Sequence, residues 1–102
     1  MTAMYTCAGT PDAILPVEQV IPPKPSIIAA RGLPRLANMR TLMSGGTPLP
    51  PVAVYEHAGR TFLIAGLHRY TVAREMGYTH IPVVFCSETD FPIRPFTLAD
   101  YE

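Results

Sequence analysis

Short apolar runs alternate with proline and glycine along the first half of this chain, a pattern typical of short elements joined by stiff turns. Residues 14–21 are predicted to be extended, and Pro16 restricts them to a sheet edge or a strand entry. Residues 26–32 fit either a loop or one helical turn. A helix is predicted over 34–43, with Pro34 in its first turn. Its apolar positions recur at helical spacing: Leu36, Met39, Leu42 and Met43.

The next stretch predicts a β-hairpin. Residues 52–55 and 61–64 are two apolar runs rich in β-branched and aromatic side chains. The turn between them covers 56–60, where Gly59 takes the tight position. His57 falls at the tip of this hairpin, where we expect it to be solvated.

A second helix and a last strand complete the predicted fold. The helix extends from about residue 68 to residue 76 and ends at Gly77, since glycine accepts left-handed cap geometry. The run 81–85 is apolar throughout, which predicts a strand buried on both faces. The fold class is therefore a small α/β (α+β) domain with a mixed or antiparallel sheet and two main helices packed on it.

The chain of 102 residues has the length of one domain. We expect a mobile tail over 1–12, the folded domain over 13–86 and an acidic, aromatic tail over 87–102. This last segment docks either on the domain or on a protein partner, through Phe91, Pro92, Pro95, Phe96 and Tyr101. The sequence has neither a long apolar run nor a secretory signal at its start, so a cytoplasmic protein without membrane contact is predicted.

Charge is distributed unevenly although the formal net charge is zero. The window 24–74 contains seven basic side chains and Glu56 as its one acid, whereas acids dominate outside it. The basic residues are Lys24, Arg31, Arg35, Arg40, Arg60, Arg69 and Arg74. This pattern favours an anionic ligand near the middle of the chain, with a solvated mixed surface as the alternative.

The candidate site is the turn 65–70, with the sequence AGLHRY, between the strand 61–64 and the following helix. Backbone amides of Gly66 and Leu67 and the positive helix end point to one place there, where anions bind readily. His68 and Arg69 add side-chain donors, and arginine can grip a phosphate with two hydrogen bonds. The turn is therefore predicted to hold a phosphate, and most naturally that of a nucleotide.

Catalysis is harder to predict than binding. His68 is the one candidate acid–base group, because the ordinary pKa of histidine lies near neutrality. No paired carboxylates stand at a useful spacing, so no metal site is predicted within the protein. Cys7 and Cys86 lie too far apart for a metal-ligand motif, and Cys86 is expected to be a small buried side chain.

The order of these motifs resembles the ParB/sulfiredoxin superfamily. Residues 49–54 resemble its Pro-Pro strand entry, 65–70 its nucleotide-binding turn, and 74–83 its glycine followed by an Ile-Pro-Val strand. The resemblance implies ATP or another nucleotide as ligand, with Mg²⁺ as an open addition. It also implies that the helix 34–43 helps to cradle the phosphates. Its polar side chains are Arg35, Asn38, Arg40 and Thr41.

The superfamily carries several activities, and the resemblance selects among them only in part. Sulfiredoxins place a catalytic cysteine before the His-Arg pair, and Leu67 stands there in this chain. ParB-like relatives bind CTP and DNA, and others are serine kinases, nucleases or ATPases. The resemblance implies a nucleotide-binding domain with at most weak DNA contact, in a plasmid, phage or DNA-maintenance setting. Hydrolysis of the nucleotide, phosphate transfer, nuclease activity and regulation without turnover all stay open. The alternative is a non-enzymatic interaction module that keeps only the fold.

Overall fold

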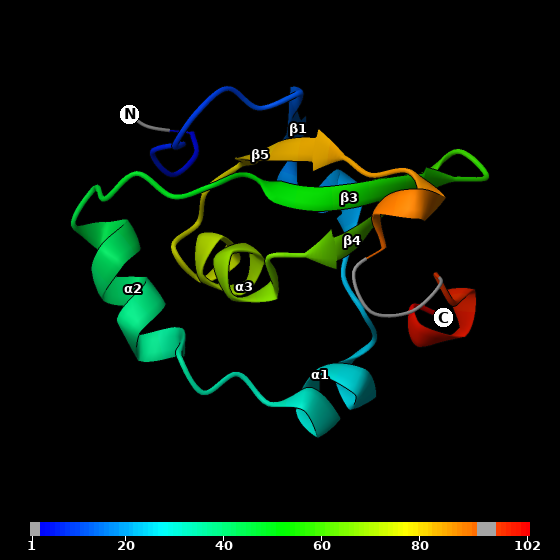
Figure 1. Cartoon of the computed structure of the whole chain (residues 1–102). Coiled ribbons are helices and arrows are strands. Elements are labelled where there is room, and N and C mark those ends of the chain that lie inside the picture. The colour runs from blue at the N-terminus through cyan, green and yellow to red at the C-terminus, as the bar shows by residue number, and fades with distance from the viewer. Residues whose placement is uncertain (1–2, 92–95) are drawn as a thin grey trace.

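The computed structural model describes residues 3–91 and 96–102, and in these residues five strands form one mixed sheet (Figure 1). The strands are β1 (Ala13–Pro16), β2 (Val20–Ile21), β3 (Val52–His57), β4 (Arg60–Ala65) and β5 (His80–Phe85). Their order across the sheet is β1-β5-β3-β4-β2. The outer pair β1–β5 and the central hairpin β3–β4 are antiparallel, whereas β3–β5 and β2–β4 are parallel. The predicted fold class, with its mixed sheet, is confirmed.

The segment predicted as one extended run over 14–21 forms two strands at opposite edges of the sheet. A single 3₁₀ turn, η1 (Val17–Gln19), separates β1 from β2. Proline at position 16 ends β1, where its missing N–H costs no ladder bond at a strand end. The buried side chain of Val17 then anchors the turn in the core.

The hairpin β3–β4 forms as predicted. Its two turn residues, Ala58 and Gly59, both have positive φ, at 52° and 77°. Turns of this kind match the twist of the flanking strands, and glycine adopts them without steric cost. Gly59 therefore occupies the position that the sequence assigned to it.

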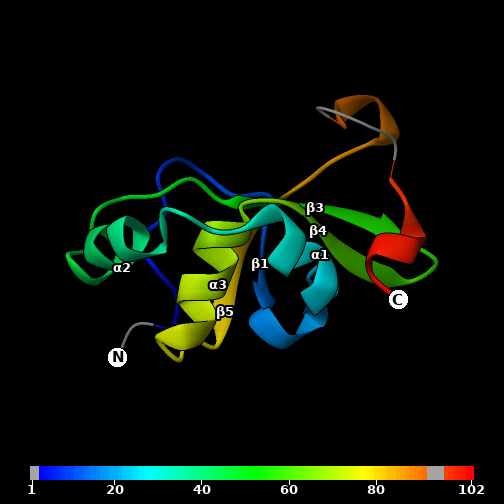
Figure 2. The same ribbon diagram turned by 90° about the horizontal axis from the view of Figure 1, so that it is seen from below.

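Three helices lie on the same side of the sheet (Figures 1 and 2). They are α1 (Pro25–Arg31), α2 (Leu36–Ser44) and α3 (Leu67–Glu75). The sequence left α1 open, and its first residue is a proline, which the first helical position tolerates. Helix α2 begins two residues later than predicted and packs beside α3. No helix in the described part of the chain is both long and apolar enough to cross a membrane.

The core joins the sheet to α3. The strand residues Val52, Val54, Ile81 and Val83 are fully buried, as are Val72 and Ala73 of α3. The buried face of α3 also carries Tyr70, as the sequence predicted. This packing fixes the start of α3 against the centre of the sheet.

The N-terminal segment packs more tightly than the mobile tail expected over 1–12. Tyr5 is only 1% exposed and belongs to the core. The segment pairs with Leu49, since Leu49 N–H donates to Thr6 O and Ala8 N–H donates to Leu49 O. Tyr5 is the only aromatic residue of the segment 1–12, where apolar residues follow no helix or strand period, so no pattern indicated its burial.

The C-terminal segment docks on the domain itself, one of its two predicted options. Phe96 and Tyr101 each lie with their ring centroids 5.0 Å from that of Phe62, which is completely buried. Tyr101 donates a hydrogen bond to Leu63 O at 2.6 Å. Two predicted docking residues, Pro92 and Pro95, lie outside the described residues.

Candidate functional site

Gly66 connects the end of β4 to the start of α3. It adopts a left-handed conformation, with φ of 96°, and no side chain caps the helix. A Cβ atom at this position would lie 2.8 Å from Val52 Cγ1 and 2.9 Å from Arg69 Nη2. The turn therefore requires glycine for two reasons, a positive φ and a lack of space.

The first turn of α3 presents its backbone amides beyond Gly66. The helical ladder begins with Tyr70 N–H, which donates to Gly66 O at 2.9 Å. The amides of Leu67, His68 and Arg69 precede it, and helix geometry gives them no partner within the helix. The Leu67 side chain is buried in the core, so this residue offers the site only its amide. These amides and the helix dipole favour an anion here.

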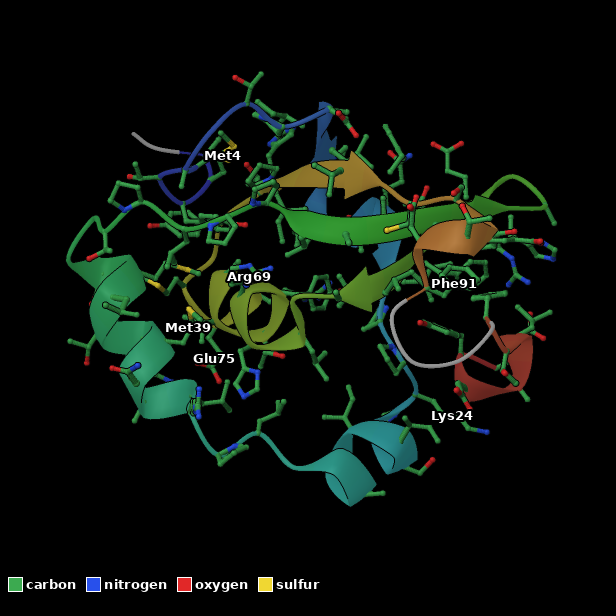
Figure 3. All side chains as sticks on the ribbon, viewed as in Figure 1. Met4, Lys24, Met39, Arg69, Glu75 and Phe91 are labelled. Carbon is green, nitrogen blue, oxygen red and sulfur yellow. The ribbon has the colours of Figure 1, made fainter. Side chains whose placement is uncertain are left out.

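Arg69 folds back over the turn that precedes it. Its Nη2 donates to Pro51 O at 3.3 Å and lies close above Gly66. Its Nε is buried and has no hydrogen-bond partner within the described residues. Figure 3 shows Arg69 on a different side of α3 from Glu75, which lies toward Met39 and α2. Arg69 is thus half-buried, and its guanidinium is held against the Pro51 carbonyl.

His68, which precedes Arg69, also has a side-chain nitrogen without a hydrogen-bond partner in the described residues. Its side chain is partly buried, and its Nε2 has no hydrogen-bond partner within the described residues. A buried polar atom without a partner costs free energy. Two neighbouring residues at the positive end of a helix therefore carry nitrogens with unused hydrogen-bonding capacity.

Sequence reasoning did not identify Tyr5 as a neighbour of this site. Its hydroxyl donates to Pro50 O at 2.7 Å. Burial raises the pKa of Tyr5 to about 12, although the charge of Arg69 and a hydrogen bond with it act in the opposite direction. Tyr5 and Arg69 are therefore close neighbours, and both bind the carbonyl groups of the Pro50–Pro51 segment.

Helix α2 contributes less to this turn than the resemblance implied. Arg40 forms a two-pronged ion pair with Glu75, with Nε–Oε2 and Nη2–Oε1 distances of 2.7 and 3.0 Å. Glu75 ends α3, about 13 Å along the helix axis from Gly66 at 1.5 Å per residue. The pair raises the pKa of Arg40 and lowers that of Glu75. Arg40 thus holds α2 against the far end of α3.

The other predicted α2 residues lie on the surface. Thr41 is exposed, and its hydroxyl donates to Ala37 O in the preceding turn of the same helix. Arg35 precedes the helix and Asn38 lies in its first turn, and both are exposed. The structure therefore brings together Gly66, Leu67, His68 and Arg69, and leaves the α2 side chains on a neighbouring element.

In the part of the chain that the structure describes, neither acids nor cysteines gather into a metal site. Across residues 3–91 and 96–102, no group of three or more His, Cys, Asp or Glu side chains could hold a metal ion. Cys7 and Cys86 are free thiols. Cys86 follows β5 and is partly exposed, and its pKa is raised by burial and then by Asp90.

No family model and no curated protein matches the sequence, but several solved structures share the arrangement of elements described above, among them the following three. Sulfiredoxin from Arabidopsis thaliana has a TM-score of 0.58 at 20% identity, covering 74% of this chain and 83% of that protein. The chromosome-partitioning protein ParB from Caulobacter crescentus, complexed to the centromeric parS site, has a TM-score of 0.57 at 21% identity over 78% of this chain. A free serine kinase in complex with AMP has a TM-score of 0.61 at 12% identity over 84% of this chain.

The chain therefore has the ParB/sulfiredoxin-like fold. It spans 41% of the ParB chain and 35% of the kinase chain, so it corresponds to one part of each. Structural similarity at such low sequence identity shows the fold alone, so the activity has to be argued from the residues of the site.

Proposed function

We propose that this chain binds a nucleotide by its phosphates at the Gly66–Arg69 turn. The observation that carries the proposal is the pair of buried, unpartnered nitrogens, His68 Nε2 and Arg69 Nε, at an uncapped helix N-terminus. A bound phosphate would accept hydrogen bonds from the first-turn amides, and from these two side chains after a local movement that exposes their nitrogens. The fold supports this choice, because one protein that shares it was solved in complex with AMP.

The ligand that we propose is ATP or another nucleotide. The described residues lack a cluster of carboxylates, so any Mg²⁺ would arrive on the phosphates and not on a protein site. Three exposed residues remain proposed outer contacts to a longer phosphate chain: Arg35, which precedes α2, and Asn38 and Thr41, which lie on it. Arg40 would have to leave Glu75 to join them.

His68 is the proposed acid–base group if binding leads to chemistry. Sulfinic acid reduction needs a thiol, and the corresponding position carries the buried, unreactive side chain of Leu67. Phosphoryl transfer, hydrolysis and regulation without turnover all stay compatible with this site. Contact with DNA, such as the ParB relative makes with parS, would be weak here because the basic residues are spread over separate elements.

The alternative function is a protein-interaction module that keeps the fold without a ligand. The two are distinguished by calorimetric titration with ATP, CTP and ADP. Arg69→Ala removes a charged donor worth roughly 1.5–3 kcal/mol, so its affinity should fall at least about tenfold. The matched control is Arg60→Ala, which removes an equal charge on the hairpin, where Arg60 pairs with Glu102. Absence of binding by the wild-type chain, or equal affinity for Arg69→Ala, would refute the proposal.

A further inference from the structure

The N-terminal segment is pinned at two places on the domain. Ala3 O accepts hydrogen bonds from the amides of Thr79 and His80, both at 3.0 Å, at the start of β5. The backbone bonds between Thr6, Ala8 and Leu49 hold the segment beside the chain that enters β3. Tyr5 lies between these two attachments and is thereby fixed in the core.

Tyr5 and Arg69 bind two consecutive carbonyl groups. The Tyr5 hydroxyl donates to Pro50 O at 2.7 Å, and Arg69 Nη2 donates to Pro51 O at 3.3 Å. Proline rings fix φ at both acceptor residues, and Pro51 also restricts Pro50 to extended backbone, so the segment that carries the two carbonyls is stiff. A constraint that Tyr5 places on Pro50 is therefore transmitted to the carbonyl that holds Arg69.

The Tyr5 hydroxyl remains a donor at physiological pH. Its raised pKa, about 12, keeps the phenol neutral well above neutrality. A neutral phenol beside Arg69 leaves the guanidinium charge available to an anion, whereas a carboxylate in this place would neutralise it. The arrangement orients an arginine without consuming its charge.

We propose that Tyr5 is a positioning residue for the phosphate site, acting through the Pro50–Pro51 segment to hold the Arg69 guanidinium over Gly66. The expected effect of Tyr5 on nucleotide affinity rests on the proposed function. Positioning by Tyr5 predicts a property of the ligand-free chain as well, because a guanidinium held in this way shields its Nε–H from solvent.

The first experiment measures solvent exchange of the Arg69 Nε–H by NMR in the ligand-free protein. In the wild-type chain this proton should exchange at least about tenfold more slowly than that of a solvated arginine such as Arg35, since buried groups exchange only on local opening. Tyr5→Phe should accelerate the exchange. The matched control is Tyr101→Phe, which deletes another tyrosine hydroxyl donating to a backbone carbonyl, Leu63 O.

The second experiment titrates the same variants with ATP and with inorganic tripolyphosphate. Tyr5→Phe should weaken binding of both by about three- to tenfold, the effect of one net hydrogen bond, and Tyr101→Phe should leave it unchanged. The Tyr5→Phe effect should disappear in an Arg69→Ala background, because a positioning residue acts only through its partner.

The outcomes separate this inference from the proposed function. Slow Arg69 exchange that Tyr5→Phe accelerates supports positioning, even if neither probe binds and the proposed function fails. Wild-type Arg69 exchange as fast as that of Arg35 overturns it, a result that requires no variant to fold. Equal exchange in Tyr5→Phe and Tyr101→Phe also overturns it, as does equal affinity of the two variants for a probe that binds the wild type.

Discussion

Two regions of this small domain differ in whether their polar side-chain groups have hydrogen-bond partners. Beside the hairpin, the rings of Phe96 and Tyr101 from the C-terminal segment pack against Phe62. The Arg60 guanidinium carbon lies 5.1 Å from the centroid of the same ring. At the other region, the start of α3, the side chains of His68 and Arg69 each have a buried nitrogen that lacks a hydrogen-bond partner in the described residues.

The difference indicates that the first region stabilises the fold, whereas the second region costs it some stability. Aromatic rings close the first region, and its tyrosine hydroxyl and ion pair are satisfied by Leu63 O and Glu102. The second region leaves no room for a side chain at Gly66, yet it has polar nitrogens without partners in the described residues. Buried polar groups without partners cost free energy, so natural structures retain few of them, and a water, an ion or a functional role usually accounts for each one.

The largest expected effect separates stability from binding. Phe62→Ala should lower the free energy of unfolding by about 3–5 kcal/mol, the usual cost of removing a buried phenylalanine. Affinity for ATP should stay unchanged at temperatures where the variant is folded, because Phe62 faces the C-terminal segment. Urea unfolding and calorimetry measure the two quantities, and an ATP affinity that falls with Phe62→Ala would show that the regions are coupled.

Gly66→Ala should cost less stability and abolish binding. A Cβ atom clashes with Val52 and Arg69 and the residue keeps a positive φ, so we expect a loss of roughly 2–4 kcal/mol from strain and overpacking. The matched control is Gly77→Ala, where φ is 77° and no heavy atom lies within 4 Å of the added Cβ. The free energy of unfolding of Gly77→Ala should fall by about 1–2 kcal/mol, because alanine is strained at a positive φ, and nucleotide binding should be intact. Equal losses in the two variants would show that the crowding at Gly66 is relieved at little cost.

The same comparison explains what the sequence could predict. Local patterns define the hairpin, the Gly66 turn and the apolar strand over 81–85, and each of these is present. The resemblance correctly indicated the fold from the order of these motifs. The helix α3 begins at the turn as expected, so four of the candidate residues are neighbours by succession alone.

Contacts between distant segments were not predictable in the same way. Burial of Tyr5 depends on Pro50, 45 positions later, and no local period records such a contact. The single run 14–21 divides between the two sheet edges, where it pairs with β5 and β4. Both partners occur much later in the chain, so the run itself does not predict the division. The pairing of Arg40 with Glu75 joins two helices whose packing no pattern specifies.

A smaller effect should appear at alkaline pH. The pKa of Tyr5 is about 12 in the folded chain against an ordinary 10.0, so the folded state keeps a proton that the unfolded chain releases. The stability contributed by this tyrosine is therefore complete below pH 10 and is lost as pH rises toward 12. Tyr5→Phe lacks this loss, so its urea midpoint should fall less than that of the wild type between about pH 9 and about pH 11. Parallel midpoints in the two proteins would show that the tyrosine is less buried than described.

The smallest effect concerns the ion pair at the far end of α3. The pKa of Glu75 is lowered, first by its hydrogen bond with Arg40, so its stabilising contribution is present above the ordinary value of 4.5 and disappears as pH falls below it. Glu75→Gln should therefore reduce the loss of stability between neutral and acidic pH only slightly, because both side chains are exposed and water screens the pair. Glu56→Gln on the hairpin serves as the control for the loss of one negative charge.

The same variant tests whether α2 takes part in the phosphate site. Glu75→Gln releases Arg40 from its partner. If Arg40 reaches the nucleotide, ATP should bind more tightly to this variant than to Glu56→Gln, since the competing carboxylate is gone. If the site consists of the Gly66–Arg69 turn alone, the two variants should bind ATP equally, because about 13 Å of helix separates Glu75 from Gly66. Calorimetric titration at low ionic strength, where exposed charges act most strongly, distinguishes these cases.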